Sequence, residues 1–203
     1  MAQEIELKVA VSSHSEVVDA LRAAGGEAVG AFVQTDCFFD TADRSLFHSD
    51  RGLRLRRVEA LADEAGGGQA GPGAVVTFKG PRRAKEGLKV RAEFETAVGD
   101  GEALTRIFEA CGLTAMLTIQ KRRSSWRLGG CTVELDELPA IGRFVEVEGP
   151  DERAIEAVRE ALGLAGEPIT ESYVAMIDAR LGPLPPGAEV TFETVAGWLD
   201  RTT

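Results

Sequence analysis

The chain has 203 residues, of which 44% are hydrophobic, so one domain could bury a substantial core. Its 33 acidic and 23 basic residues give a net charge of −10, which excludes a general basic field that would attract nucleic acid or an anionic membrane surface. Any phosphate-binding site must therefore be a local concentration of Lys and Arg.

The N-terminal half begins with a predicted strand at Gln3–Val11, where polar and apolar residues alternate. A helix is predicted at Ser15–Ala24, and strand character returns at Thr35–Phe39 and Leu53–Val58. Residues Leu61–Gly73 are rich in Gly and Ala without a periodic apolar pattern, which predicts a mobile hairpin loop.

Beyond that loop the strand pattern recurs five times. These strands are predicted at Ala74–Lys79, Leu88–Thr96, Leu117–Leu128, Cys131–Glu137 and Arg143–Glu148. Helices are predicted at Glu102–Cys111, Glu152–Leu162, Glu171–Leu181 and Phe192–Asp200. Asp151 and Thr170 are the expected N-caps of the two helices that follow them.

Three cysteines at wide spacing give neither a disulfide framework nor a zinc motif, which favours a reducing compartment. The N-terminus lacks a basic segment followed by an apolar one, and no apolar run approaches the ~20 residues that cross a bilayer. We therefore expect a cytoplasmic protein that binds neither nucleic acid nor membrane.

Charged residues on the predicted strands keep a period of two, so each set shares one face of its strand. The acidic members are Glu4, Glu6, Glu93, Glu95, Glu134, Asp136, Glu146 and Glu148, and the basic members are Lys8, Arg54, Arg56, Lys79, Lys89, Arg91, Lys121 and Arg123. A half-buried sheet with its charged face in water would explain any single strand. The uniformity across strands favours a sheet closed on itself, with charged faces inward and apolar faces against helices.

An enclosed charged interior needs a charged ligand with counter-ions, because unpaired buried charges cost several kcal/mol each. A polyphosphate with bound Mg²⁺ or Mn²⁺ meets this need, since Arg and Lys bind phosphate oxygens and carboxylates bind hard metal ions. Zinc is disfavoured because the two histidines, His14 and His48, are expected to be surface residues.

An ordered set of motifs over residues 3–181 resembles the CYTH superfamily, the triphosphate tunnel metalloenzymes. The motifs are ExExK at Glu4–Lys8, FDT at Phe39–Thr41, LRLR at Leu53–Arg56, TFKGP at Thr77–Pro81, VRAEFE at Val90–Glu95, QKRR at Gln120–Arg123, ELDEL at Glu134–Leu138 and GRFVEVE at Gly142–Glu148. The resemblance implies an α+β fold, a closed eight-stranded antiparallel β tunnel with a polar interior and helices packed outside. We expect this domain at residues 1–182, with residues 183–203 as a helical tail packed on it.

The resemblance also implies roles for individual residues. Those that would bind the triphosphate are Lys8, Arg54, Arg56, Lys79, Arg91, Lys121 and Arg123. Those that would bind the metal ions are Glu4, Glu6, Glu93, Asp136, Glu146 and Glu148. Lys79 resembles the lysine that orients or activates the attacking water. In some family triphosphatases a tyrosine works beside that lysine, whereas here the equivalent position is Phe38 and the only tyrosine is Tyr173.

The expected function is metal-dependent hydrolysis of a small-molecule triphosphate, such as inorganic, thiamine or nucleoside triphosphate. Two alternatives stay open: a class IV adenylate cyclase that converts ATP to cyclic AMP and pyrophosphate, and a non-catalytic module that binds polyphosphates or nucleotides. The full set of acidic residues favours an enzyme over a simple anion binder. A homodimer is compatible with the sequence.

Overall fold

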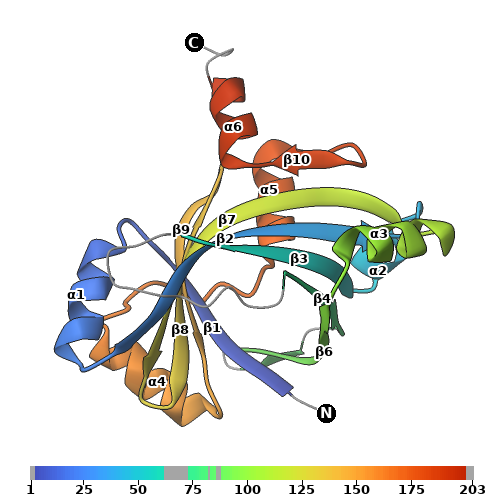
Figure 1. The fold of residues 1–203 in the computed structure, drawn as a ribbon. Helices are drawn as coiled ribbons and strands as arrows, with labels where there is room; N and C mark the ends of the chain where they lie inside the picture. Colours follow the sequence, from blue (N-terminus) through green and yellow to red (C-terminus); the bar gives the residue numbers. More distant parts are fainter. Residues whose placement is uncertain (1–2, 62–72, 82, 86–87, 200–203) are drawn as a thin grey trace.

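The computed structural model describes residues 3–61, 73–81, 83–85 and 88–199, which form ten strands and six helices (Figure 1). Within these ranges the side chains of residues 3–4, 83–85, 88–90 and 196–199 are not described. The predicted hairpin loop at Leu61–Gly73 lies almost wholly outside the described residues.

Eight strands form a strongly curled antiparallel sheet in the order β1-β9-β8-β7-β2-β3-β4-β6. Their bounds are β1 Gln3–Val11, β2 Glu27–Asp40, β3 Gly52–Ala60, β4 Ala74–Lys79, β6 Leu88–Val98, β7 Thr114–Leu128, β8 Cys131–Leu138 and β9 Gly142–Glu148. β1 also pairs with β6, in register from Gln3 opposite Ala92 to Glu6 opposite Lys89. The predicted α+β class and antiparallel eight-stranded sheet are confirmed.

Two short strands extend this sheet. β5 (Arg83–Lys85) pairs with β6, and β10 (Ala188–Val190) runs parallel to β7. The chain after residue 182 was expected to be a helical tail, but it contains β10 as well as the helix α6 (Phe192–Leu199). Val190 is fully buried against β7, so this strand ties the segment to the sheet.

The outer face of the sheet carries the apolar rows and most of the helices. Helices α1 (Ser15–Ala23) and α4 (Glu152–Ala161) cover β1, β8 and β9, where Val9, Val133 and Val145 are completely buried. Helix α3 (Gly101–Ala110) covers β3 and its neighbours through a smaller cluster around Leu55 and Phe39. The period-two apolar pattern therefore supplies the main core.

Helix α5 (Tyr173–Leu181) departs from the expectation that helices pack outside. Its Ile177 is buried among Ile119, Leu138 and Phe144. These three residues share their strand faces with the charged residues two positions away, so α5 covers one end of the inward face. The physical reason is that the inward rows turn apolar at this end and need burial.

The end of α5 nearest this face is also capped differently from the prediction. Ser172, rather than Thr170, is the N-cap, and its hydroxyl accepts a hydrogen bond from the Ala175 amide at 3.2 Å. Asp151 caps α4 as expected. None of the helices in the described ranges is both long and apolar enough to cross a bilayer.

Candidate active site

A cavity of about 860 Å³ lies against the charged face of the curled sheet. Its walls include most of the residues predicted to bind substrate or metal: Glu6, Lys8, Arg54, Arg56, Lys79, Arg91, Glu93, Lys121, Arg123, Glu146 and Glu148. These residues come from β1, β3, β4, β6, β7 and β9. The curled sheet therefore brings residues that are far apart in the sequence to one concave space.

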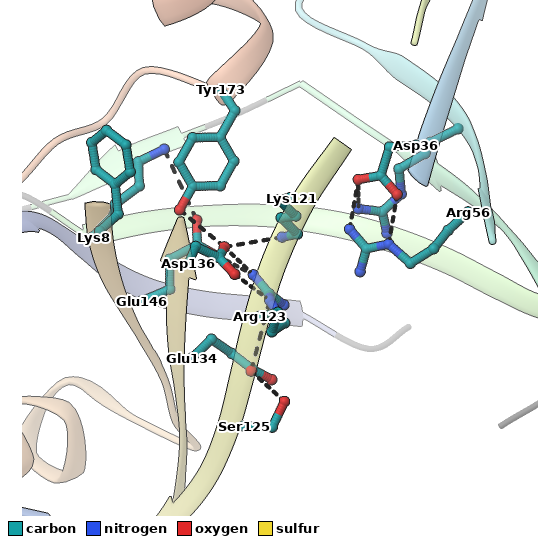
Figure 2. Close-up of polar contacts among 12 residues, drawn as sticks. Lys8, Asp36, Arg56, Lys121, Arg123, Ser125, Glu134, Asp136, Glu146 and Tyr173 are labelled. Carbon is teal, nitrogen blue, oxygen red and sulfur yellow. Dashed lines mark hydrogen bonds and ion pairs between the residues drawn. The ribbon is translucent and has the colours of Figure 1, made fainter. Parts of the chain in front are cut away.

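Arg54 and Arg56 are held by Asp36, which the sequence had not indicated. Arg56 donates from Nε and Nη2 to the two oxygens of Asp36, both at 2.7 Å, and Arg54 Nη1 lies 3.5 Å from Oδ2 (Figure 2). Burial alone would raise the pKa of Asp36, but the charges of Arg56 and Arg54 outweigh it and hold that pKa well below its ordinary value. Asp36 is therefore a fixed anion beneath the two guanidinium groups.

Asp136 on β8 is likewise a buried anion, and it holds the cationic side chains of β7. It is completely buried, and it accepts hydrogen bonds from Lys121 Nζ at 3.0 Å, Arg123 Nε at 2.6 Å and the Tyr173 hydroxyl at 3.1 Å (Figure 2). It is not among the residues that line the cavity. We assign Asp136 the role of counter-ion rather than the metal-binding role expected from the sequence, because its oxygens already bind these donors.

Lys8 and Glu146 complete this buried network. Arg123 Nη2 donates to Glu146 at 2.8 Å, and Lys8 Nζ lies 4.0 Å from the same carboxylate. Lys8 Nζ also donates to the Glu171 carbonyl at 2.5 Å and lies 4.2 Å from the centroid of the Tyr173 ring. Tyr173, at the start of α5, thus contacts residues from the four strands β1, β7, β8 and β9.

Burial lowers the pKa of one lysine in the site. Desolvation, followed by the charge of Arg123, lowers the pKa of Lys121 to about 8, although Asp136 opposes the change. Glu134 shows the opposite effect, since burial raises the pKa of its carboxyl even though it accepts a 2.6 Å hydrogen bond from Ser125. An anion that binds near Lys121 would therefore stabilise the charged form of this lysine.

Lys79, the expected catalytic residue, ends β4 on the cavity wall. Its Nζ lies 2.9 Å from Oε2 of Glu93 on β6, which was expected to bind metal. The pair is partly exposed, so it is open to exchange with ligands or solvent. Nearby, Arg91 donates to the Gly80 carbonyl from Nε at 3.1 Å and Nη2 at 2.8 Å.

Two carboxylates face one another where β1 meets β9. Glu6 and Glu148 are directly opposite in the antiparallel register, and both line the cavity. A cation bound beside both carboxylates would offset the repulsion between like charges that face each other on a strand pair. Among the residues with described side chains, no group of three or more acidic, His or Cys residues is preassembled for a metal. The side chain of Glu4 lies outside the described set.

This donor set fits Mg²⁺ or Mn²⁺. Such ions bind to one or two carboxylates and complete their coordination with water and substrate phosphate. A protein cage of three or more ligands is therefore unnecessary. Glu6 and Glu148 suit this chemistry, whereas neither histidine does. His14 is half-buried with Nε2 3.2 Å from the Phe144 carbonyl, and so it is not the plain surface residue that was expected.

The other end of the cavity is bordered by a segment in which the sequence analysis predicted no helix. The short helix α2 (Ser45–His48) follows β2, and its first amides are bound by Asp40. Asp40 Oδ1 accepts from the Leu46 amide at 2.9 Å, and Oδ2 accepts from the Phe47 amide at 2.8 Å.

Comparison with known proteins gives a consistent match. The family model described as CYTH domain matches residues 2–172. A protein of Methanocaldococcus jannaschii named "Putative adenylate cyclase MJ0240" is 30% identical over 145 residues, which are 71% of this chain and 75% of that protein.

Solved structures of low identity share the fold. The PH1012 protein of Pyrococcus horikoshii OT3 is 22% identical with a TM-score of 0.69, over 85% of this chain and 98% of that one. The "Putative adenylyl cyclase HpAC1" from Hippeastrum, which is described as revealing a dominant triphosphatase activity, is 22% identical with a TM-score of 0.67, over 92% of this chain and 98% of that one.

Proposed function

The chain belongs to the CYTH family, whose members act on triphosphates, and from this premise we propose that it hydrolyses a triphosphate compound in the cavity described above. The observation that carries the proposal is the state of Arg54. Its Nε is buried in the cationic wall and has no hydrogen-bond partner within the described part of the chain. A buried donor of this kind is costly unless a ligand acceptor meets it, and a phosphate oxygen is such an acceptor.

The cationic wall suits a chain of phosphates rather than a single one. Arg54 and Arg56 on β3, Lys121 and Arg123 on β7, and Lys8 on β1 line the same cavity from different strands. Fixed cations in a partly desolvated site stabilise charge that builds up on phosphate oxygens during transfer. Because Asp36 and Asp136 already hold these side chains, little reorganisation is needed when the substrate binds.

Divalent metal belongs to the proposal, since CYTH triphosphate tunnel proteins are metal-dependent in general. We assign Glu6 and Glu148 to hold it, with Glu4 as a further candidate beyond the described side chains. A bound Mg²⁺ or Mn²⁺ would neutralise phosphate charge. Glu146 and Glu93 are engaged by Arg123 and Lys79, so we give them the role of orienting those cations.

Lys79 is the residue to which we assign the attacking water. It lies on the cavity wall at the end of β4, where its ammonium group is 2.9 Å from the Glu93 carboxylate. Phe38 lines the same cavity where some family triphosphatases have a tyrosine, so it adds no proton-transfer group. In-line attack by water on the terminal phosphorus would release orthophosphate without a covalent enzyme intermediate.

The shape of the site supports a closed tunnel as the functional form. β1 pairs with β9 along one edge and with β6 along the other, so the eight strands make a continuous circuit of pairings. Closure would exclude bulk water from the charged interior and strengthen its electrostatic effects. Helix α5 would then cover one end of the interior.

Adenylate cyclase activity is the second candidate, and the relative from M. jannaschii carries that name at 30% identity. The same cationic wall would serve attack by a ribose hydroxyl on the α-phosphate. The protein from Hippeastrum pairs both activities in its description, so the shared fold does not distinguish them.

Product analysis distinguishes these candidates. The purified protein is incubated with Mg²⁺ or Mn²⁺ and, separately, with inorganic triphosphate, thiamine triphosphate and ATP. Orthophosphate release is the expected result. Cyclic AMP with pyrophosphate would show the cyclase instead, and tight binding without any product would show a non-catalytic module.

A matched pair of variants tests the metal assignment. Glu148→Gln removes one carboxylate of the facing pair, and we expect kcat to fall at least 100-fold with a weaker response to Mg²⁺. Glu137→Gln is the control, because Glu137 lies on the outward face of the next strand and pairs with Arg122 and Arg143. Wild-type turnover and metal dependence in Glu148→Gln would overturn this role.

A further inference from the structure

Tyr173 stands where the apolar cluster around α5 meets the charged network of the sheet. It is the first residue of α5, and its ring packs against Phe144 with the ring centroids 5.2 Å apart. The same side chain lines the cavity. Contacts with the apolar cluster therefore hold the ring at the border of the charged site, where it can act on the side chains that line it.

The Tyr173 hydroxyl contributes a hydrogen bond without a charge. It donates to Oδ2 of Asp136 at 3.1 Å, and the same carboxylate binds the ammonium group of Lys121 and the guanidinium group of Arg123. Burial, together with the negative charges of Asp136 and Glu146, raises the pKa of Tyr173 well above its ordinary value. The hydroxyl therefore stays protonated at neutral pH and remains a neutral donor.

The ring of Tyr173 lies close to two buried ammonium groups. Lys8 Nζ is 4.2 Å from the ring centroid, and Lys121 Nζ is 5.4 Å from it (Figure 2). Lys8 is 1% exposed and Lys121 is 4% exposed, so water stabilises neither charge to any large extent. An ammonium group within about 6 Å of an aromatic centroid is attracted to the negative face of the ring, and this attraction is stronger when the pair is desolvated. One aromatic side chain thus stabilises two lysines from different strands, β1 and β7.

An aromatic face differs from a further carboxylate as a partner for these lysines. Asp136 and Glu146 already lie beside them. Another carboxylate would cancel more of their positive charge and would repel a phosphate oxygen nearby. The ring has no net charge, so it stabilises the ammonium groups and leaves their positive charge available to an anionic ligand.

We infer that Tyr173 is a positioning residue for the triphosphate site, which stabilises Lys8 and Lys121 through its ring and fixes the carboxylate of Asp136 beside them through its hydroxyl. The inference rests on the proposed function, because it concerns the same anion in the same cavity. It also gives α5 a part in the site, since the sheet supplies the cations and the helix supplies the neutral group that stabilises them.

Two substitutions separate the ring from the hydroxyl. Tyr173→Phe keeps the ring and removes the hydroxyl, whereas Tyr173→Leu removes both and keeps an apolar side chain. The Kd of inorganic triphosphate is measured by calorimetry at pH 7 with a metal chelator, so that turnover does not interfere. We expect Tyr173→Leu to raise this Kd about tenfold, equivalent to about 1.4 kcal/mol, and Tyr173→Phe to raise it only about threefold.

Ile177→Val is the control for packing alone. It shortens a completely buried side chain on the same helix, in the apolar cluster that Tyr173 borders. It should lower the stability to urea and leave the Kd at the wild-type value. If Tyr173 served only to pack α5, Tyr173→Leu would behave in the same way. That result, or equal Kd values for Tyr173→Leu and Tyr173→Phe, would overturn the inference.

Product analysis keeps this inference apart from the proposed function. If the wild type binds inorganic triphosphate but releases no orthophosphate with Mg²⁺ or Mn²⁺, the proposed hydrolysis fails and the Kd values of the variants still decide the role of Tyr173. If the wild type neither binds triphosphate nor releases orthophosphate, both proposals fail.

Discussion

Two buried carboxylates hold the cationic side chains of the site in place. Asp36 binds Arg56 through two parallel hydrogen bonds, and Asp136 binds both Lys121 and Arg123. A buried carboxylate that holds several cations fixes their side-chain conformations, because each planar guanidinium fits the acceptor in one orientation. We therefore propose that these two residues position the cations of the site.

Asp36→Asn tests this role. The change leaves two largely buried guanidinium groups without their anion, and we expect the free energy of unfolding to fall by about 3 kcal/mol. Asp19→Asn is the control, since Asp19 is 80% exposed and pairs only loosely with Arg22 at 3.9 Å. It should change stability by less than about 0.5 kcal/mol. Urea denaturation measures both values, and equal stabilities of the two variants would contradict this role for Asp36.

The low pKa of Lys121 predicts how substrate binding depends on pH. Its pKa of about 8 means that the ammonium charge is present below pH 8 and is lost as the pH rises through that value. The triphosphate keeps its negative charge over this range. We therefore expect the Kd for inorganic triphosphate to rise about tenfold between pH 7 and pH 9.5, measured by calorimetry with Mg²⁺.

Lys121→Met provides the comparison for this pH effect. The variant should bind more weakly at pH 7, because one cation is missing, and its Kd should change less between pH 7 and pH 9.5. A pH dependence in Lys121→Met as steep as that of the wild type would assign the titration to another group.

At the scale of elements, period-two patterns predicted most of the sheet. β1 and β4 have the predicted bounds, and β7, β8 and β9 differ from the prediction by a few residues at their ends. The pattern also predicted most of the cavity wall, since alternation alone places Arg54 with Arg56 and Lys121 with Arg123 on one face. Charged side chains that keep this period identify the inward face without knowledge of strand order.

Other elements depended on contacts that alternation does not encode. Asp36 lies within a predicted strand, but its role comes from β3, which is remote in sequence. The three-residue strand β10 forms because it pairs with β7, and α2 forms because Asp40 binds its amides. Helix α5 packs on the inward face of the sheet because Leu138 and Phe144 are apolar residues on strand faces that are otherwise charged. The repeated charged pattern gave no sign of these two local exceptions.

A matched pair of isoleucines tests the placement of α5. Ile177 on α5 is completely buried, whereas Ile107 on α3 is 55% exposed. We expect Ile177→Ala to destabilise the protein by about 2–5 kcal/mol and Ile107→Ala by less than 1 kcal/mol, measured by urea denaturation. Similar small effects for both variants would show that α5 is not firmly packed on the inward face.

At the scale of the whole molecule, several cations are buried inside a chain that is acidic as a whole. The net charge is −10, yet Lys8, Lys121 and the paired arginines lie in the buried part of one cavity. We therefore expect the acidic chain to repel extended polyanions such as nucleic acid, whereas a small triphosphate that enters the cavity would reach these buried Lys and Arg side chains. This arrangement selects ligands by size as well as by charge.

Closure of the sheet can be tested by amide hydrogen exchange. β1 has strand neighbours on both sides, β9 and β6, so its amides should exchange as slowly as those of β8, which lies between β7 and β9. In an open sheet, the β1 amides that point toward β6 would instead exchange as fast as those of an unpaired edge. Mass spectrometry of peptides that cover residues 3–11 distinguishes the two outcomes.

The buried carboxylates also bear on how the reaction cycle ends. A pocket of unpaired cations would retain diphosphate or orthophosphate almost as firmly as the substrate, and release would then limit turnover. Asp36 and Asp136 already bind their cations in this structure, so on the proposed mechanism a departing anion would leave behind charges that are already compensated. We therefore expect the same residues that arrange the site for binding to keep inhibition by orthophosphate and diphosphate weak.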